Sequence, residues 1–171
     1  MEQTEQREQA PYKVLGIDPG LADTGYAIIN EYKGQLVLQE GGLIRTDSQY
    51  PLNQRLREIY AELNAVIRGQ QPAVVAIEDL YSDYLNPSTA ILMGHARGVC
   101  LLAAADYGLT VSSYSPARVK KSLTGNGRAS KEQVKAMVRI NLGLEQKPLS
   151  EHIADAIAVA LCHIRCQRIK V

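Results

Sequence analysis

The spacing of hydrophobic and polar residues changes several times along the chain, and each change predicts a new element. Residues 12–18, 25–32 and 35–44 are apolar, partly β-branched runs joined by short glycine-containing turns. We predict three strands of an antiparallel meander from them. Between 51 and 68 the apolar residues recur every three or four positions, which predicts an amphipathic helix. Residues 74–78 are continuously apolar, as is typical of a buried central strand.

The second half of the chain predicts a further strand and four helices. Residues 87–107 form a helix rich in alanine, leucine and glycine, and 109–114 form a strand. Ser115 precedes Pro116, and this pair starts a helix because serine caps the N-terminus and proline suits the first helical position. Serine also precedes each of the last two helices. Ser130 and Gln133 form a capping-box pattern that predicts a helix to about Leu142, and Ser150 precedes a predicted helix from 151 to about 166.

The resulting order is βββ-α-β-α-β-α-α-α. Helix-linked strands after an antiparallel meander predict an α/β fold with a mixed five-stranded sheet and helices on both faces. No repeat or linker divides the chain, so we expect a single domain over residues 12–171. Residues 1–11, which are mostly polar and do not form a secretory signal, are expected to be a flexible extension.

Composition narrows the class of protein only moderately. The 171 residues are 46% hydrophobic with a net charge of +1, and we expect no apolar stretch near the roughly 20 residues of a membrane span. The three cysteines have no framework spacing, which favours reduced thiols and a cytoplasmic location without membrane association. Cys162, His163 and Cys166 are the alternative, a zinc site, but structural zinc needs four ligands.

Three separate segments each supply an acid that a metal-dependent nuclease needs. Asp18 and Glu78 follow apolar strands that should lie side by side, about 4.8 Å apart, so both carboxylates can reach one ion. His152 and Asp155 stand three residues apart on a predicted helix and share a face. Each acid also has a structural interpretation, as an Asx turn, a loop cap or a partner of the helix dipole.

Such a donor set predicts a particular metal chemistry. Oxygen ligands suit Mg²⁺ or Mn²⁺, and two ions in one site can activate a water and stabilise a leaving oxygen. His152 would be either a metal ligand or a general base.

The neutral chain contains one locally basic region. Between 118 and 135 a single acid, Glu132, accompanies six basic residues: Arg118, Lys120, Lys121, Arg128, Lys131 and Lys135. This pattern indicates either a nucleic-acid-binding strip or an ordinary solvated helix surface.

Taken together, these motifs resemble the RuvC family of bacterial Holliday junction resolvases, which have a ribonuclease H-like fold. The resemblance extends from about residue 12 to 166. The matching segments are G-I-D-P-G-L-A-D-T-G-Y (16–26), A-I-E-D-L-Y (76–81), G-H-A-R-G-V (94–99), Y-S-P-A-R-V-K (114–120), G-N-G-R-A-S-K-E-Q-V (125–134) and H-I-A-D-A-I-A-V-A (152–160).

The resemblance implies roles for individual residues. The metal-binding positions of the family fall on Asp18, Glu78 and Asp155, with His152 at a fourth position where relatives have either Asp or His. An aromatic residue near the point of strand exchange matches Tyr81, and Tyr84 is a rival for that role. Family lysines that approach DNA match Lys120 and Lys131. Neighbouring residues expected to contact phosphates are Arg118, Lys121 and Arg128.

The resemblance also implies an activity and partners. We expect a homodimer that cuts four-way DNA junctions in recombination and repair, by paired symmetric nicks that leave 5′-phosphate and 3′-hydroxyl ends. A branch-migration complex of the RuvA and RuvB type would supply the junction. The helix at 87–107, with small residues Gly94, Ala96, Gly98 and Ala103, is the candidate dimer interface; the alternative for it is packing on the sheet.

Three other functions are compatible with parts of the pattern. A related nuclease acting on RNA–DNA hybrids or other branched DNA would need different surfaces. An actin-like ATPase would use Asp18, Gly20, Thr24 and Gly25 as a phosphate loop, but that fold needs two such domains. A non-catalytic junction-binding protein would gain nothing from clustered acids where phosphates must lie.

Overall fold

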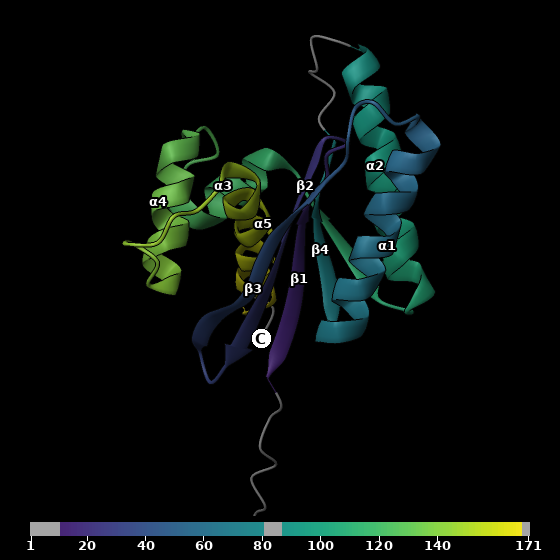
Figure 1. The fold of residues 1–171 in the computed structure, drawn as a ribbon. Helices are drawn as coiled ribbons and strands as arrows, with labels where there is room; N and C mark the ends of the chain where they lie inside the picture. Colours follow the sequence, from purple (N-terminus) through teal and green to yellow (C-terminus); the bar gives the residue numbers. More distant parts are fainter. Residues whose placement is uncertain (1–10, 81–86, 169–171) are drawn as a thin grey trace, which may run out of the picture.

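The computed structural model describes residues 11–80 and 87–168, which form one five-stranded sheet with helices on both faces (Figure 1). The elements are β1 (Tyr12–Asp18), β2 (Asp23–Tyr32), β3 (Gln35–Arg45), α1 (Leu52–Gln70), β4 (Val74–Glu78), α2 (Pro87–Asp106), β5 (Thr110–Tyr114), α3 (Pro116–Thr124), α4 (Lys131–Leu142) and α5 (Glu151–Arg168). The predicted fold class and order are confirmed. The predicted extension at 1–11 lies outside the described residues, apart from Pro11.

The sheet places β1 at its centre. The strand order is β3-β2-β1-β4-β5, with β1 antiparallel to β2 and parallel to β4. Ile17 pairs with Ile77, and each is followed by an acid that ends its strand. Because parallel strands end at the same edge, Asp18 and Glu78 project from neighbouring positions, as predicted.

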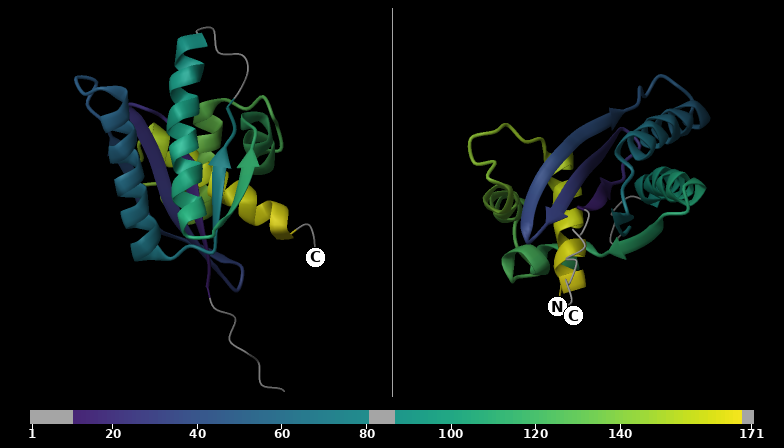
Figure 2. Two further views of the ribbon diagram at one scale, coloured as in Figure 1. Left: turned by 90° about the vertical axis from the view of Figure 1, so that its right-hand side faces the viewer. Right: turned by 90° about the horizontal axis from the view of Figure 1, so that it is seen from below.

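The helices cover the two faces unequally. Helices α1 and α2 pack against each other and cover one face, with α2 seen in front of the sheet in Figure 2. Helices α3, α4 and α5 lie on the other face, where α5 packs directly on β1 and β2. Its residues Ala156 to Ile164 are all buried, so α5 is the central helix of this layer.

Serine side chains start three helices, as predicted. The Ser115 hydroxyl accepts the amide N–H of Arg118 at the start of α3. Ser130 and Gln133 form a complete capping box on α4. The Ser150 hydroxyl accepts the amide N–H of Ile153 at 3.4 Å, which orients the first turn of α5, where His152 lies.

Helix α2 corrects one expectation. It is the one helix in the described part of the chain that is long and apolar enough to cross a membrane by length and composition, although only 22% of its most apolar window is buried. One such helix is weak evidence for a membrane span. Its inner face carries buried Ala96, Cys100 and Ala103, which pack into the α1-side core.

Candidate active site

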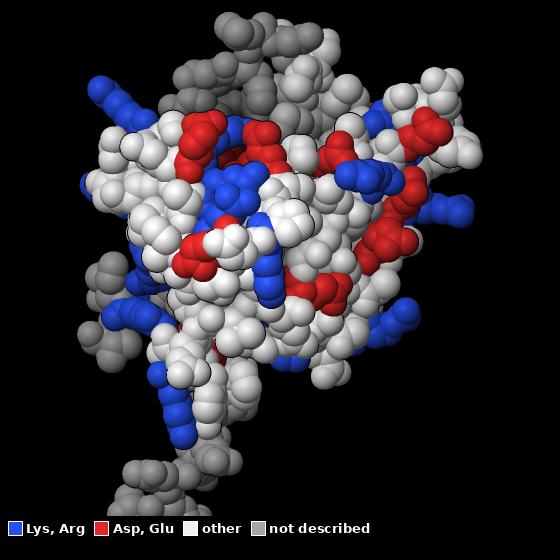
Figure 3. Space-filling model, turned by 60° about the vertical axis from the view of Figure 1, so that its left-hand side comes forward, with Lys and Arg blue, Asp and Glu red and all other residues white. Residues whose placement is uncertain are grey.

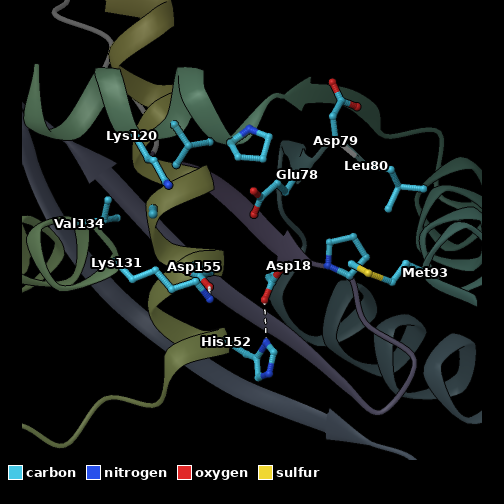
Figure 4. Close-up of a pocket in the computed structure, with 14 residues that line it drawn as sticks. Asp18, Glu78, Asp79, Leu80, Met93, Lys120, Lys131, Val134, His152 and Asp155 are labelled. Carbon is cyan, nitrogen blue, oxygen red and sulfur yellow. Dashed lines mark hydrogen bonds and ion pairs between the residues drawn. The ribbon is translucent and has the colours of Figure 1, made fainter. Parts of the chain in front are cut away.

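Residues of β1, β4, α2, α3, α4 and α5 surround a cavity of about 300 Å³ at the edge of the sheet where β1 and β4 end (Figure 4). Asp18 and Glu78 enter it from β1 and β4, and His152 and Asp155 enter it from the first turns of α5. The structure therefore brings all four sequence-predicted site residues to one cavity. The other lining residues are Pro19, Asp79, Leu80, Met93, Pro116, Val119, Lys120, Lys131, Val134 and Ala158.

A hydrogen bond links the first strand to the last helix across this cavity. His152 Nδ1 and Asp18 Oδ2 are 2.8 Å apart. The Asp18 side chain is only 16% exposed, whereas that of His152 is 45% exposed. The carboxylate therefore lies at the base of the site, and the imidazole forms its more open wall.

Burial raises the pKa values of three acids of the cavity, Asp18, Glu78 and Asp155. Burial, opposed by the hydrogen bond from His152, raises the pKa of Asp18 to about 6. Burial, together with the charges of Asp18 and Asp155, raises the pKa of Glu78 to about 7. Burial also raises the pKa of Asp155, against the lowering effect of Lys131. Raised carboxyl pKa values around one cavity indicate a site that a cation would stabilise.

One lysine already approaches this acidic cluster. Lys131, from the first turn of α4, binds the carboxylate of Glu151, and its Nζ lies 3.9 Å from Asp155 Oδ2. The hydrogen bond to Glu151 is the largest cause of the raised pKa of Lys131. Lys120 lines the same cavity from α3. These two ammonium groups place positive charge beside the acids.

The chemistry of the donor set fits a hard divalent cation. The carboxylates of Asp18, Glu78, Asp79 and Asp155 and the imidazole of His152 line the cavity. Carboxylate oxygens are the ligands that Mg²⁺ and Mn²⁺ prefer. As the side chains lie, no three Asp, Glu, His or Cys groups within residues 11–80 and 87–168 converge on one ion. Asp18 is hydrogen-bonded to His152, and Asp155 lies 3.9 Å from the Lys131 ammonium group.

Among the described residues, three further predicted DNA-binding residues, Arg118, Lys121 and Arg128, do not line the cavity. Arg118 stacks over Tyr114 at 5.5 Å and contacts Cys166, while Lys121 and Arg128 lie at and beyond the end of α3. Figure 3 shows basic and acidic side chains interspersed on this side of the molecule. Tyr81 and Tyr84 fall outside the described residues.

Sequence reasoning assigned no role to two polar residues beside the site. Asp79 lines the cavity one residue after Glu78. Arg97 of α2 donates hydrogen bonds to the Glu78 carbonyl and the Asp79 carboxylate. Arg97 belongs to the segment at 94–99, whose similarity to the family was the only signal available for it.

A five-stranded sheet of this order, with helices on both faces, defines the ribonuclease H-like class of fold. A family model described as "Crossover junction endodeoxyribonuclease RuvC" matches residues 14–163. A protein of that name from Rhodopirellula baltica is 48% identical over 149 residues, covering 87% of this chain and 84% of the relative. Another from Alkaliphilus metalliredigens is 45% identical over 150 residues, covering 88% and 91%. The chain therefore belongs to the RuvC family of crossover junction endodeoxyribonucleases.

Solved structures agree with this assignment. The Thermus thermophilus RuvC structure superimposes with a TM-score of 0.85 at 37% identity, covering 92% of this chain and 96% of the other. T. thermophilus RuvC in complex with a Holliday junction substrate gives a TM-score of 0.87 at 37% identity, covering 93% and 96%. The yeast mitochondrial Holliday junction resolvase Ydc2, at 12% identity and a TM-score of 0.63, shares the fold.

Proposed function

We propose that this protein resolves four-way DNA junctions by cutting two opposing strands at the cavity formed by Asp18, Glu78, His152 and Asp155. The observation that carries the proposal is the convergence of these four residues, from β1, β4 and α5, on one cavity in a RuvC-family chain. The similarity to a relative solved with a Holliday junction favours the junction over an RNA–DNA hybrid as the substrate.

Nucleases of this family depend on divalent metal, and the four cavity residues are the groups that would hold it here. We infer Mg²⁺ or Mn²⁺, and two ions per site, from the predominance of carboxylate donors. When bound, the metal supplies charge stabilisation at the phosphate and lowers the pKa of a nearby water. Cation binding would also bring the raised pKa values of Asp18 and Glu78 back down.

The chain's own residues would then orient the reaction. An ionised Asp18 accepts a hydrogen bond from the Nδ1–H of His152, which fixes the imidazole and leaves Nε2 with a lone pair directed away from Asp18. That nitrogen can be a metal ligand, or it can take the proton of the attacking water. The water oxygen bonds to phosphorus as the bond from phosphorus to O3′ breaks. The products are a 5′-phosphate and a 3′-hydroxyl.

Basic residues would guide the DNA strand to the acids. Lys120 and Lys131 border the cavity and offset the charge of a phosphate placed there. We assign phosphate contacts farther along the DNA to Arg118, Lys121 and Arg128, and stacking near the exchange point to Tyr81.

Two cuts on opposing strands require two sites, and a homodimer with two-fold symmetry supplies them. The exposed stripe of α2, formed by Ile91, His95, Gly98 and Leu102, supports an interface there because it spans three turns on one face. Of the small residues considered from the sequence, Ala96 and Ala103 pack inside the subunit instead. A branch-migration complex of the RuvA and RuvB type is the expected source of junctions.

The three cysteines are free thiols, which supports action in the reducing cytoplasm.

The proposal is tested with purified protein and three labelled substrates: a synthetic four-way junction, the matched linear duplex and an RNA–DNA hybrid. Each is incubated with Mg²⁺, with Mn²⁺ and with a chelator. We expect metal-dependent, paired nicks in the junction alone. Equal cutting of duplex and junction, or preferred cutting of the hybrid, would overturn the assignment of the substrate.

A further inference from the structure

Arg97 joins helix α2 to the end of the strand that carries Glu78. Its Nε donates to the Glu78 carbonyl oxygen at 3.2 Å. Its Nη2 donates to Asp79 Oδ1 at 2.8 Å and to the Ser113 hydroxyl at 2.8 Å. One guanidinium therefore bridges the end of β4, the first residue beyond it and the neighbouring strand β5.

The Arg97 side of these contacts is mostly buried, whereas the Asp79 side is open to solvent. The Arg97 side chain is 19% exposed, and Asp79, which is 43% exposed, neutralises its charge. Asp79 is held from a second direction, because its amide N–H donates to the Tyr114 carbonyl at 2.9 Å and extends the β4–β5 ladder by one position. The charge-assisted hydrogen bond from Arg97 and the amide hydrogen bond to Tyr114 together hold Asp79 from two directions.

The three hydrogen bonds of Arg97 to Glu78, Asp79 and Ser113 are called the Arg97 clamp below. The geometry of strand β4 connects this clamp with the cavity. Successive side chains of a strand point to opposite faces, so a backbone fixed at 78 and 79 also fixes the face of the sheet from which the Glu78 side chain extends into the cavity. Arg97 holds this backbone from α2, on the face of the sheet opposite α5.

We propose that Arg97 is a positioning residue for junction cleavage: from α2 it fixes the backbone of Glu78 and Asp79, and so keeps the Glu78 carboxylate directed into the metal-binding cavity. The inference rests on the proposed function of Glu78 as a metal ligand. It also gives the segment at 94–99 a physical role, and it links the candidate dimer helix to the site.

The guanidinium fork, and not only its charge, is needed for this role. A lysine at position 97 keeps a positive charge but cannot donate in three fixed directions. Arg97→Lys and Arg97→Met should therefore behave alike. Arg57, exposed on α1, gives a matched control in Arg57→Met.

The primary readout is Mn²⁺ binding to the DNA-free protein, followed by electron paramagnetic resonance of the free ion. Loss of residues that orient metal ligands commonly weakens metal affinity by about 10- to 100-fold, and we expect roughly 10-fold for both Arg97 variants. The metal concentration for half-maximal junction cleavage should rise in parallel. Junction affinity measured without metal should change less than about twofold, and Arg57→Met should match the wild type.

Several results would overturn the inference. Unchanged Mn²⁺ binding in both Arg97 variants would show that the clamp does not direct Glu78. Normal binding by Arg97→Lys beside weak binding by Arg97→Met would assign the effect to charge alone. Equal losses of metal and junction binding with a lowered melting temperature would indicate a general structural role. If Arg97→Met does not fold, Arg97→Lys and Asp79→Asn decide the same question.

A reference variant separates this inference from the proposed function. Glu78→Gln should itself weaken Mn²⁺ binding; if it does not, the premise that Glu78 is a ligand fails. If wild-type protein binds Mn²⁺ but does not cut junctions, the proposed function fails while the Arg97 measurement still stands on metal binding.

Discussion

Asp18 and Glu78 have raised pKa values because they are buried and face other carboxylates in the cavity. For a group of this kind the unfolded state ionises first, so folding costs more as the pH rises from the unfolded pKa through the folded one. The destabilisation should therefore develop between about pH 4 and 7 and persist above that range. The clustered carboxylates therefore lower the folding stability of the metal-free protein while providing a place for a cation.

Glu78→Gln should consequently raise the melting temperature of the metal-free protein, because it removes the buried charge. The increase should be larger at pH 8 than at pH 5, since the carboxyl of the folded protein is mostly protonated at the lower pH. Differential scanning calorimetry at both pH values measures the increase in melting temperature. In the same experiment, adding Mn²⁺ should stabilise only the wild type. An increase of the same size at both pH values would contradict the raised pKa.

Lys120→Ala should weaken junction binding by removing one phosphate contact near the cavity. We expect the slope of log affinity against log salt to fall by about one. Lys33→Ala is the control, because Lys33 lies in the β2–β3 turn over the Tyr32 ring. Binding titrations at several salt concentrations test whether Lys120 contacts a phosphate. Equal slopes for the wild type and Lys120→Ala would exclude the contact.

The four residues of the proposed active site could be predicted from the sequence because their spacing determines where their side chains lie. Asp18 and Glu78 end adjacent parallel strands, and His152 and Asp155 share a helix face, so their meeting followed from the order of elements. The Arg97 clamp was not predictable in this way, because it depends on how α2 crosses the ends of β4 and β5. The contact of Lys131 with Glu151 likewise depends on the packing of α4 against α5.

At the scale of elements, the position of α5 on the sheet determines whether its two site residues reach Asp18. Two glycines allow the close approach: a Cβ on Gly16 would lie 2.1 Å from the Ala156 carbonyl oxygen, and one on Gly25 would lie 2.2 Å from that of His152. Strand and helix types were readable from apolar spacing. This close contact was not, because a glycine within a strand is equally typical of a bulge or a tight bend.

Gly16→Val should force α5 away from β1, because the added side chain meets helix backbone and not a flexible side chain. We expect the free energy of unfolding to fall by about 1–3 kcal/mol, and cleavage to fall further as Asp155 moves from Asp18. Denaturant unfolding and single-turnover cleavage measure the two effects.

Gly69→Ala is the matched control for this substitution. Gly69 lies in α1 with nothing within 4 Å of an added Cβ. Alanine should therefore stabilise the protein by about 0.4–1 kcal/mol and leave cleavage unchanged. A stability loss as large as that of Gly16→Val would show that the effect does not come from helix–strand contact.

At the scale of the whole molecule, α2 has two different faces. Its inner face belongs to the core, while Ile91 and Leu102 on its outer face are 61% and 54% exposed. Because the outer face is apolar as well as the inner one, the helix is apolar enough by composition to cross a membrane. Sequence periodicity identified the helix but could not divide its faces, because both are rich in small and apolar residues.

Ile91→Glu should convert the proposed dimer to monomer by placing a charge in the α2 interface. Ile140→Glu is the control, since Ile140 is equally exposed, at 61%, on α4. Analytical ultracentrifugation should show a shift to monomer for the first variant alone. A monomeric wild type, or dimers of unchanged affinity in Ile91→Glu, would exclude α2 as the interface.

The most direct test of the proposed active site compares wild type with Asp18→Asn on one labelled four-way junction, with binding and single-turnover cleavage measured side by side in Mg²⁺ and Mn²⁺. Asparagine keeps the shape of the side chain and can still accept a hydrogen bond from His152, but it removes the negative charge at the base of the cavity. We predict junction affinity within about twofold of wild type and a loss of cleavage of at least roughly 100-fold, in the range seen when a metal site is impaired. Cleavage by Asp18→Asn at the wild-type rate would show that the chemistry takes place elsewhere.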